Sequence, residues 1–140
     1  MTERIVTHHL VRKEDLNHHG SLYAGRSADW IIETAYAAAA SLLPTDSIVI
    51  AKINEISYLS PIHAGEVTRF EGRVAYAGHS SLMIYVSAWV QGEKKMEGFL
   101  TVVHIGDHGR PSAHGIVLPT ESEEDKALEE RAKSLKNADR

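Results

Sequence analysis

Cysteine is absent from the 140-residue sequence, which excludes disulfide bonds, thiolate-ligated metal sites and a cysteine nucleophile. Long apolar runs are absent too. No stretch of about 18 uncharged apolar residues occurs, so we expect no membrane span. The polar first residues, MTERIVTHHLVRKED, do not have the pattern of a signal peptide. We therefore expect a cytoplasmic location.

Basic charge is scarce, because 15 Lys and Arg stand against 19 Asp and Glu, a net charge of −4. An acidic chain argues against general nucleic-acid binding, which needs a basic surface. The nine histidines do not show HExxH or a comparable metal-ligand spacing. The sequence also lacks GxSxG, a Walker loop and a dinucleotide fingerprint. We therefore expect neither a metal nor a bound cofactor, and a serine hydrolase is disfavoured.

The order of hydrophobic patterns predicts a single α+β domain. A strand is expected at 3–14 and a long helix at 22–43, which Pro44 ends. Four further strand patterns follow, at 47–59, 67–76, 82–90 and 96–105. The short breaks between these strands favour an antiparallel meander. One helix cannot cover such a sheet, so we expect two chains to pair.

The C-terminal segment is charged from Thr120 onwards. Thr120 and Glu123 fit a capping box, which predicts a surface helix over 121–136 with a solvated face of mixed charge. We therefore divide the chain into a domain at 1–119 and a charged helical tail at 120–140.

The expected long helix is apolar on most sides, which is typical of a helix buried on several sides. Its three charged residues, Arg26, Asp29 and Glu33, share one face. One interpretation is a salt-bridge cluster at the rim of the helix. The other gives Glu33 a function, because a carboxylate held among apolar side chains suits general-base or nucleophile work.

The loop before this helix is rich in polar groups, with an acid, an amide and two imidazoles within residues 15–19. If the helix begins near Gly25, its free N–H groups face this loop and stabilise a developing oxyanion. The alternative role for Asp15 and Asn17 is turn formation or capping.

Several segments together resemble the signature of hotdog-fold acyl-CoA thioesterases. They are DLNHHGSLYAG at 15–25, WIIETA at 30–35, SYLSPIHAGE at 57–66, GHSSL at 78–82 and GFLTVV at 98–103. The resemblance covers roughly residues 3–112. It implies an antiparallel sheet of five or six strands wrapped around one long central helix. It also implies an acyl-CoA substrate and a homodimer or higher homo-oligomer, with active sites at the subunit interface.

The same resemblance implies roles for individual residues. Asn17 would hold water or the thioester carbonyl, and the Gly25 amide would polarise that carbonyl. The turn formed by Gly78, His79, Ser80 and Ser81 would line the CoA site.

The chain departs from the family pattern at two places. The usual Gly-Gly pair is Ala24-Gly25 here, and the acid expected seven residues after the second glycine is replaced by Ile32. Glu33 follows one residue later, a rotation of roughly 100° on a helix. Either the local register differs and Glu33 serves, or the usual acid is lost.

Three functions remain open at this stage. The leading hypothesis is hydrolysis of an acyl-CoA thioester to free CoA and a carboxylic acid, with Glu33 as general base or nucleophile. The second is a 3-hydroxyacyl-thioester dehydratase or hydratase that pairs His19 with Glu33. The third is an acyl-CoA-binding hotdog protein without catalysis.

Overall fold

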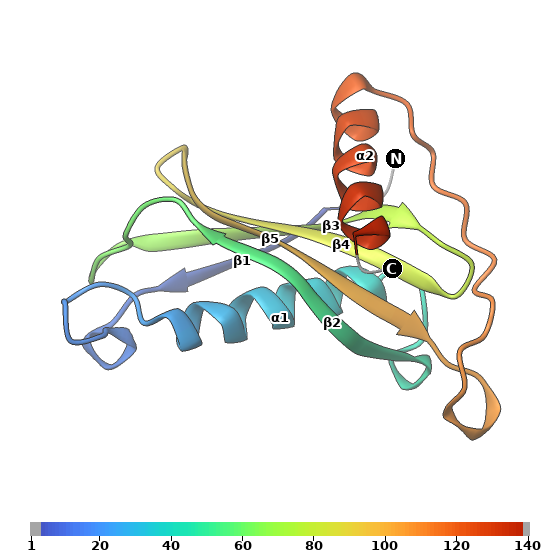
Figure 1. Cartoon of the computed structure of the whole chain (residues 1–140). Helices are drawn as coiled ribbons and strands as arrows, with labels where there is room; N and C mark the ends of the chain where they lie inside the picture. Colours follow the sequence, from blue (N-terminus) through green and yellow to red (C-terminus); the bar gives the residue numbers. More distant parts are fainter. Residues whose placement is uncertain (1–3, 139–140) are drawn as a thin grey trace.

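The computed structural model describes residues 4–138, which form a five-stranded antiparallel sheet with an α-helix on each face (Figure 1). The strands are β1 (Ile5–Leu10), β2 (Ile48–Tyr58), β3 (Val67–Ala77), β4 (Ser81–Val90) and β5 (Glu93–His104). The helices are α1 (Ala24–Ala40) and α2 (Glu123–Asn137). The predicted α+β class and all five strands are confirmed. No helix within residues 4–138 is long and apolar enough to cross a membrane.

The strand order is β1-β3-β4-β5-β2. The predicted meander is confirmed for β3 to β5, which are joined by tight turns. It is wrong for β2, which pairs with β5 and not with its sequence neighbour β3. Turn residues show where a strand ends, whereas its partner depends on contacts far away in sequence. As a result β1 and β2 are the two edges of the sheet.

Helix α1 packs on the inner face of the sheet, as the alternation in β4 predicts. Every second residue of β4 from Leu82 to Val90 belongs to this core. Gly72 of β3 lies directly against the helix, and a Cβ placed on it would be 2.9 Å from Cγ2 of Thr34. The small residues at 72 and 38 therefore set how closely the helix approaches the sheet.

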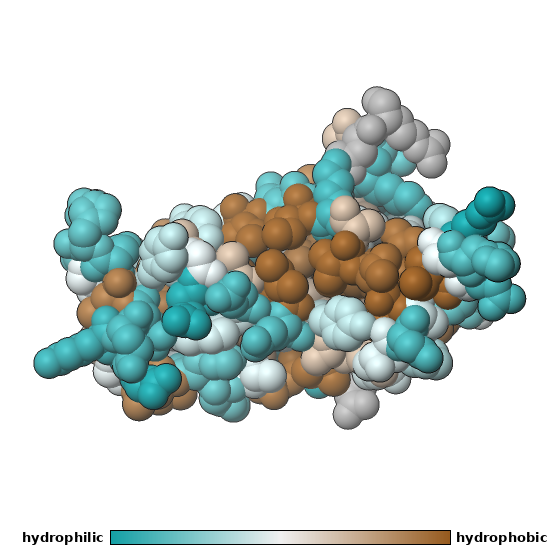
Figure 2. Space-filling view, turned by 90° about the horizontal axis from the view of Figure 1, so that it is seen from below, coloured by the Kyte–Doolittle hydropathy of each residue, from teal (hydrophilic) through white to brown (hydrophobic). Residues whose placement is uncertain are grey.

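The bounds of α1 are narrower than expected. The helix begins at Ala24 and ends at Ala40, with Ser41 as its C-cap and residues 41–43 in a turn. Its buried residues are Ser27, Ile31, Thr34, Ala35, Ala38 and Ala39, which face the sheet. The expectation of burial on several sides is therefore wrong for a single chain. Figure 2, which views the molecule from the α1 side, shows apolar side chains gathered in the middle of this face.

Helix α2 packs on the outer face of the sheet. Leu128 and Ala132 are buried against Ala75, Met83 and Phe99. The predicted cap pair of Thr120 and Glu123 is wrong, because Ser122 is the N-cap and its hydroxyl accepts the Asp125 N–H at 3.0 Å. Thr120 instead donates to Glu129 at 3.0 Å.

Candidate active site

The loop before α1 is held by Asp15, whose side chain is only 4% exposed. One carboxylate oxygen accepts the Arg12 N–H at 2.9 Å, and the other lies 3.2 Å from Nε of Arg26. The main-chain carbonyl of Asp15 accepts the Tyr23 N–H at 2.8 Å. Asp15 therefore ties both ends of the loop to the first turn of α1. Arg26 thus pairs with Asp15 of the loop, which was not part of the expected cluster of Arg26, Asp29 and Glu33 on the helix.

Asn17 shapes the same loop through its side chain. Its Oδ1 accepts the backbone N–H of His19 at 2.9 Å and of Ser21 at 3.1 Å. Its Nδ2 donates to the Ser21 hydroxyl at 3.2 Å. These bonds have the pattern of an Asx turn, as the turn-forming interpretation predicts.

A cavity of about 340 Å³ lies between this loop, the start of α1 and the segment that follows β2. Asn17, Ser21 and Ser27 supply polar groups to its wall, while Leu22, Ile62 and Met96 supply apolar surface. The Tyr58 hydroxyl closes one side by donating to the Ala24 carbonyl at 3.3 Å. The cavity therefore offers an apolar surface with a few polar groups, which is typical of small-molecule sites.

The first turn of α1 lies at this cavity with its amides uncapped by a side chain. Tyr23, the N-cap, is extended and makes no side-chain cap hydrogen bond. The first N–H groups of a helix have no intrahelical partner and carry the positive end of the helix dipole. Gly25 is the second residue of the helix. Its amide is therefore among the N–H groups that lack an intrahelical partner.

Glu33 does not lie with these groups in a single chain. Its side chain is exposed, so the expectation of a buried acid is wrong for the isolated chain. It comes nine residues after Ala24, a rotation of about 180° and a rise of roughly 13 Å along the helix. The carboxylate therefore faces away from the cavity that Ala24 lines.

The neighbour of Glu33 is His9, a residue that the sequence analysis did not single out. The His9 ring stacks on Trp30 with centroids 4.3 Å apart and planes 10° apart. Burial lowers the pKa of His9, and the negative charges of Glu33 and Asp15 oppose this shift in part. The alternation of β1, whose odd-numbered residues turn inward, was the signal that could have placed His9 against the helix.

The Gly78–Ser81 turn lies at the far end of the sheet from Asn17. Leu10, just before the loop, pairs with Val67 at the start of β3, and ten residue steps, roughly 33 Å, separate Val67 from the turn at the end of this strand. Within the turn the Gly78 N–H donates to the Ser81 carbonyl at 2.8 Å. One chain therefore brings Asn17 to the first turn of α1, where Ala24 and Ser27 line the same cavity, but leaves Glu33 and the Gly78–Ser81 turn apart from it.

The chain is similar to known proteins both in sequence and in fold. The family model of the thioesterase superfamily matches residues 19–97. The uncharacterized acyl-CoA thioester hydrolase YkhA of Bacillus subtilis (strain 168) is 28% identical over 116 residues, which cover 79% of this chain and 67% of that protein.

Solved structures agree with this match. An apo-hexameric acyl-CoA thioesterase superimposes with a TM-score of 0.86 and 29% identity, over 96% of this chain and 89% of that one. An acyl-CoA hydrolase from Staphylococcus aureus, in complex with butyryl coenzyme A, coenzyme A and coenzyme A disulfide, superimposes with a TM-score of 0.86. Its identity is 24%, over 96% of this chain and 85% of that one, so this second likeness shows the fold alone. Because the family model covers more than half of the sequence, this hotdog-fold chain belongs to the thioesterase superfamily.

Proposed function

We propose that the protein hydrolyses acyl-CoA thioesters, releasing free CoA and a carboxylic acid. The observation that carries this proposal is the cavity at the start of α1, where Asn17 and the uncapped amides of the first turn meet. Thioester hydrolysis passes through a tetrahedral oxyanion, which preorganised N–H donors stabilise. The names of the relatives YkhA and the hexameric thioesterase support acyl-CoA as the substrate.

Each predicted site residue has a role in this proposal. The Gly25 amide polarises the thioester carbonyl, and Asn17 orients the attacking water or that carbonyl. Glu33 is the general base or nucleophile. The Gly78–Ser81 turn binds part of the CoA.

The geometry favours an active site shared by two chains. Within one chain, Glu33 faces away from the cavity that holds Asn17. A second copy placed against α1 would bring its own Glu33 to that cavity. Two features support such a copy. The outer edge of β2 has no neighbouring strand within residues 4–138, and apolar side chains on or just after this strand are exposed, namely Val49, Ile53, Tyr58 and Leu59. The hexameric state of the related thioesterase also supports a homo-oligomer.

The activity is tested by free-thiol release from acyl-CoAs of increasing chain length. We expect release by the wild type, loss in Glu33→Gln, and retention in the matched control Asp29→Asn, which changes another exposed acid of the same helix. Unchanged release by Glu33→Gln would remove that residue from the mechanism. Hydration of a crotonyl thioester without thiol release would establish the dehydratase instead.

The shared site is tested by mixing two inactive variants, Glu33→Gln and Asn17→Ala. If the site takes Glu33 from one chain and Asn17 from its partner, a mixed dimer holds one intact site. Random exchange of subunits then restores about a quarter of the wild-type activity. If both residues come from the same chain, the mixture stays inactive.

We further propose that residues 1–119, which contain the family match at 19–97, are the thioesterase domain and that 120–140 are a charged helical tail, whose helix α2 packs on the sheet. We also propose a cytoplasmic location.

A further inference from the structure

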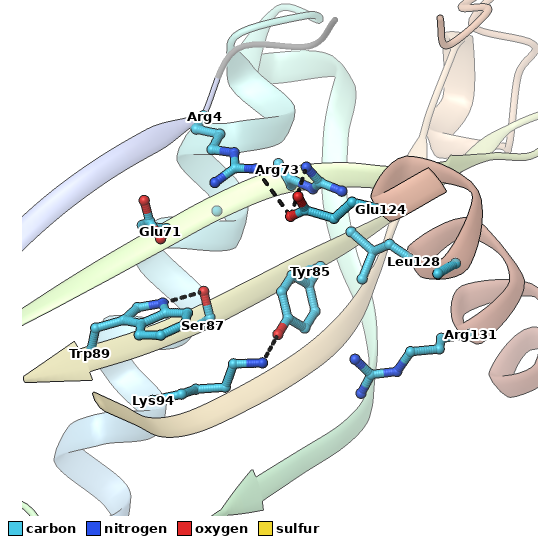
Figure 3. A pocket seen from close by; sticks show the side chains of 12 residues that line it. Arg4, Glu71, Arg73, Tyr85, Ser87, Trp89, Lys94, Glu124, Leu128 and Arg131 are labelled. Atoms are coloured by element: carbon cyan, nitrogen blue, oxygen red, sulfur yellow. Dashed lines mark hydrogen bonds and ion pairs between the residues drawn. The ribbon is translucent and has the colours of Figure 1, made fainter. Parts of the chain in front are cut away.

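A second cavity, of about 270 Å³, lies on the outer face of the sheet, in the corner between α2 and strands β3 and β4 (Figure 3). The candidate active site lies around α1 on the other face, and none of its residues lines this cavity. The two cavities are therefore separate.

The floor of this outer cavity is aromatic. Tyr85, Ser87 and Trp89 face outward from β4, and the indole N–H of Trp89 donates to the Ser87 hydroxyl at 2.9 Å. Leu128 of α2 forms an apolar wall. A ligand with a small apolar or aromatic body therefore finds a matching surface.

Positively charged side chains lie on two sides of this aromatic floor. On one side Arg4 lies 3.2 Å from Glu124, and Arg73, whose side chain is 11% exposed, lies 3.3 Å from Asp125. On the other side Lys94 and Arg131 share the carboxylate of Glu97, at 3.4 and 3.1 Å. Figure 3 shows Arg4 and Arg73 beside Glu124, with Lys94 and Arg131 on the other side of Tyr85.

The cations outnumber the carboxylates in this cluster. Four cations line the cavity, namely Arg4, Arg73, Lys94 and Arg131, against the two carboxylates of Glu71 and Glu124, although the whole chain carries −4. Asp125 and Glu97 pair with three of these cations but do not line the cavity, so the lining itself favours an anion.

The hydroxyl of Tyr85 is protonated at neutral pH. Burial raises the pKa of Tyr85, and its hydrogen bond to Glu97, 2.6 Å long, raises it further. Burial by itself would lower the pKa of Lys94, but its interactions with Tyr85 and Glu97 outweigh that effect and raise it. Lys94 therefore stays charged beside the aromatic floor.

We propose that this outer cavity binds a small monocarboxylate with an apolar body, such as an aromatic acid. The carboxylate is held by the guanidinium or ammonium groups at the rim, and the body rests on Tyr85, Trp89 and Leu128. Carboxylic acids are also what the proposed hydrolysis releases, a link that rests on the proposed function. Binding itself does not depend on catalysis.

The test uses benzoate and the fluorescence of Trp89. The sequence holds two tryptophans, so Trp30→Phe leaves Trp89 as the sole indole reporter. We expect a saturable change with benzoate, matched by heat in titration calorimetry, and much weaker binding of benzyl alcohol, which has the same ring without the charge. Equal binding of benzyl alcohol, tighter binding of inorganic phosphate, or no saturation by either method would overturn the proposal.

Two variants separate specific binding from general charge effects. Arg131→Gln removes one rim cation and should weaken benzoate binding about tenfold, the usual effect of losing a charge-assisted hydrogen bond. Lys133→Gln removes a cation of the same helix that pairs with Glu129 and Glu130 and does not line the cavity. It should bind benzoate as the wild type does. Equal weakening by both variants would contradict a built site. No thioester is used, so a failure here is distinguishable from a failure of the proposed hydrolysis.

Discussion

Replacing Asp15 with alanine should destabilise the protein more than any other single change in the loop before α1. Within residues 4–138, Asp15 is the one charged side chain that is buried. The change removes the hydrogen bond from the Arg12 N–H and the ion pair with Arg26. A hydrogen bond to a charged group contributes about 1.5–3 kcal/mol. Because the Arg26 side chain is 45% exposed, solvent screens the ion pair, which adds less than about 1 kcal/mol.

We therefore expect Asp15→Ala to lower the free energy of unfolding by about 2–3 kcal/mol. For a chain of this length, this corresponds to a fall of about 7–10 °C in Tm. Urea unfolding of the wild type, Asp15→Ala, Arg26→Ala and the double variant measures the total and the coupling of the pair. Coupling of about 0.5–1 kcal/mol is expected between the two residues. A loss below about 0.5 kcal/mol in Asp15→Ala would refute the reasoning, because surface substitutions cause changes of that size.

Three further predictions test packing, acid stability and the site. Gly72→Ala should cost about 1–3 kcal/mol by overpacking, measured by urea unfolding, and Thr34→Ser should relieve part of the loss because it removes the methyl group 2.9 Å away. Burial would raise the pKa of Glu97, but its hydrogen bonds and ion pairs outweigh this effect and lower the pKa. The ionised Glu97 therefore stabilises the folded protein fully above the ordinary pKa of 4.5, and this stabilisation is lost as the pH falls through the lower pKa of the folded state. Glu97→Gln should therefore flatten the acid limb of a Tm-against-pH curve. Gly25→Ala should keep Tm within about 1–3 °C, since alanine favours a helix and the crowded Tyr23 ring is 56% exposed, but it should lower kcat/KM for thiol release by obstructing the amide.

Local patterns in the sequence were sufficient to predict the strands and the start of α1. Alternation placed the inward residues of β4, and the polar loop marked the start of α1 near Gly25. The helix cap was misplaced because Thr120 and Ser122 both precede an acid by three residues, and only Ser122 accepts the bond.

Contacts between segments that are far apart in the sequence could not be predicted from local patterns. The pairing of β2 with β5 and of Asp15 with Arg26 depends on how the chain folds back on itself. The exposure of Glu33 depends on which side of α1 the sheet covers. Its role in catalysis stays a prediction.

The most direct test of acyl-CoA hydrolysis is incubation of the protein with butyryl-CoA in ¹⁸O-labelled water. Thiol is followed by its reaction with a chromogenic disulfide, and butyrate by mass spectrometry. We expect free CoA and ¹⁸O-labelled butyrate in equal amounts. Binding of butyryl-CoA without release of thiol, together with no thiol release from acyl-CoAs of other chain lengths, would contradict the proposed hydrolysis.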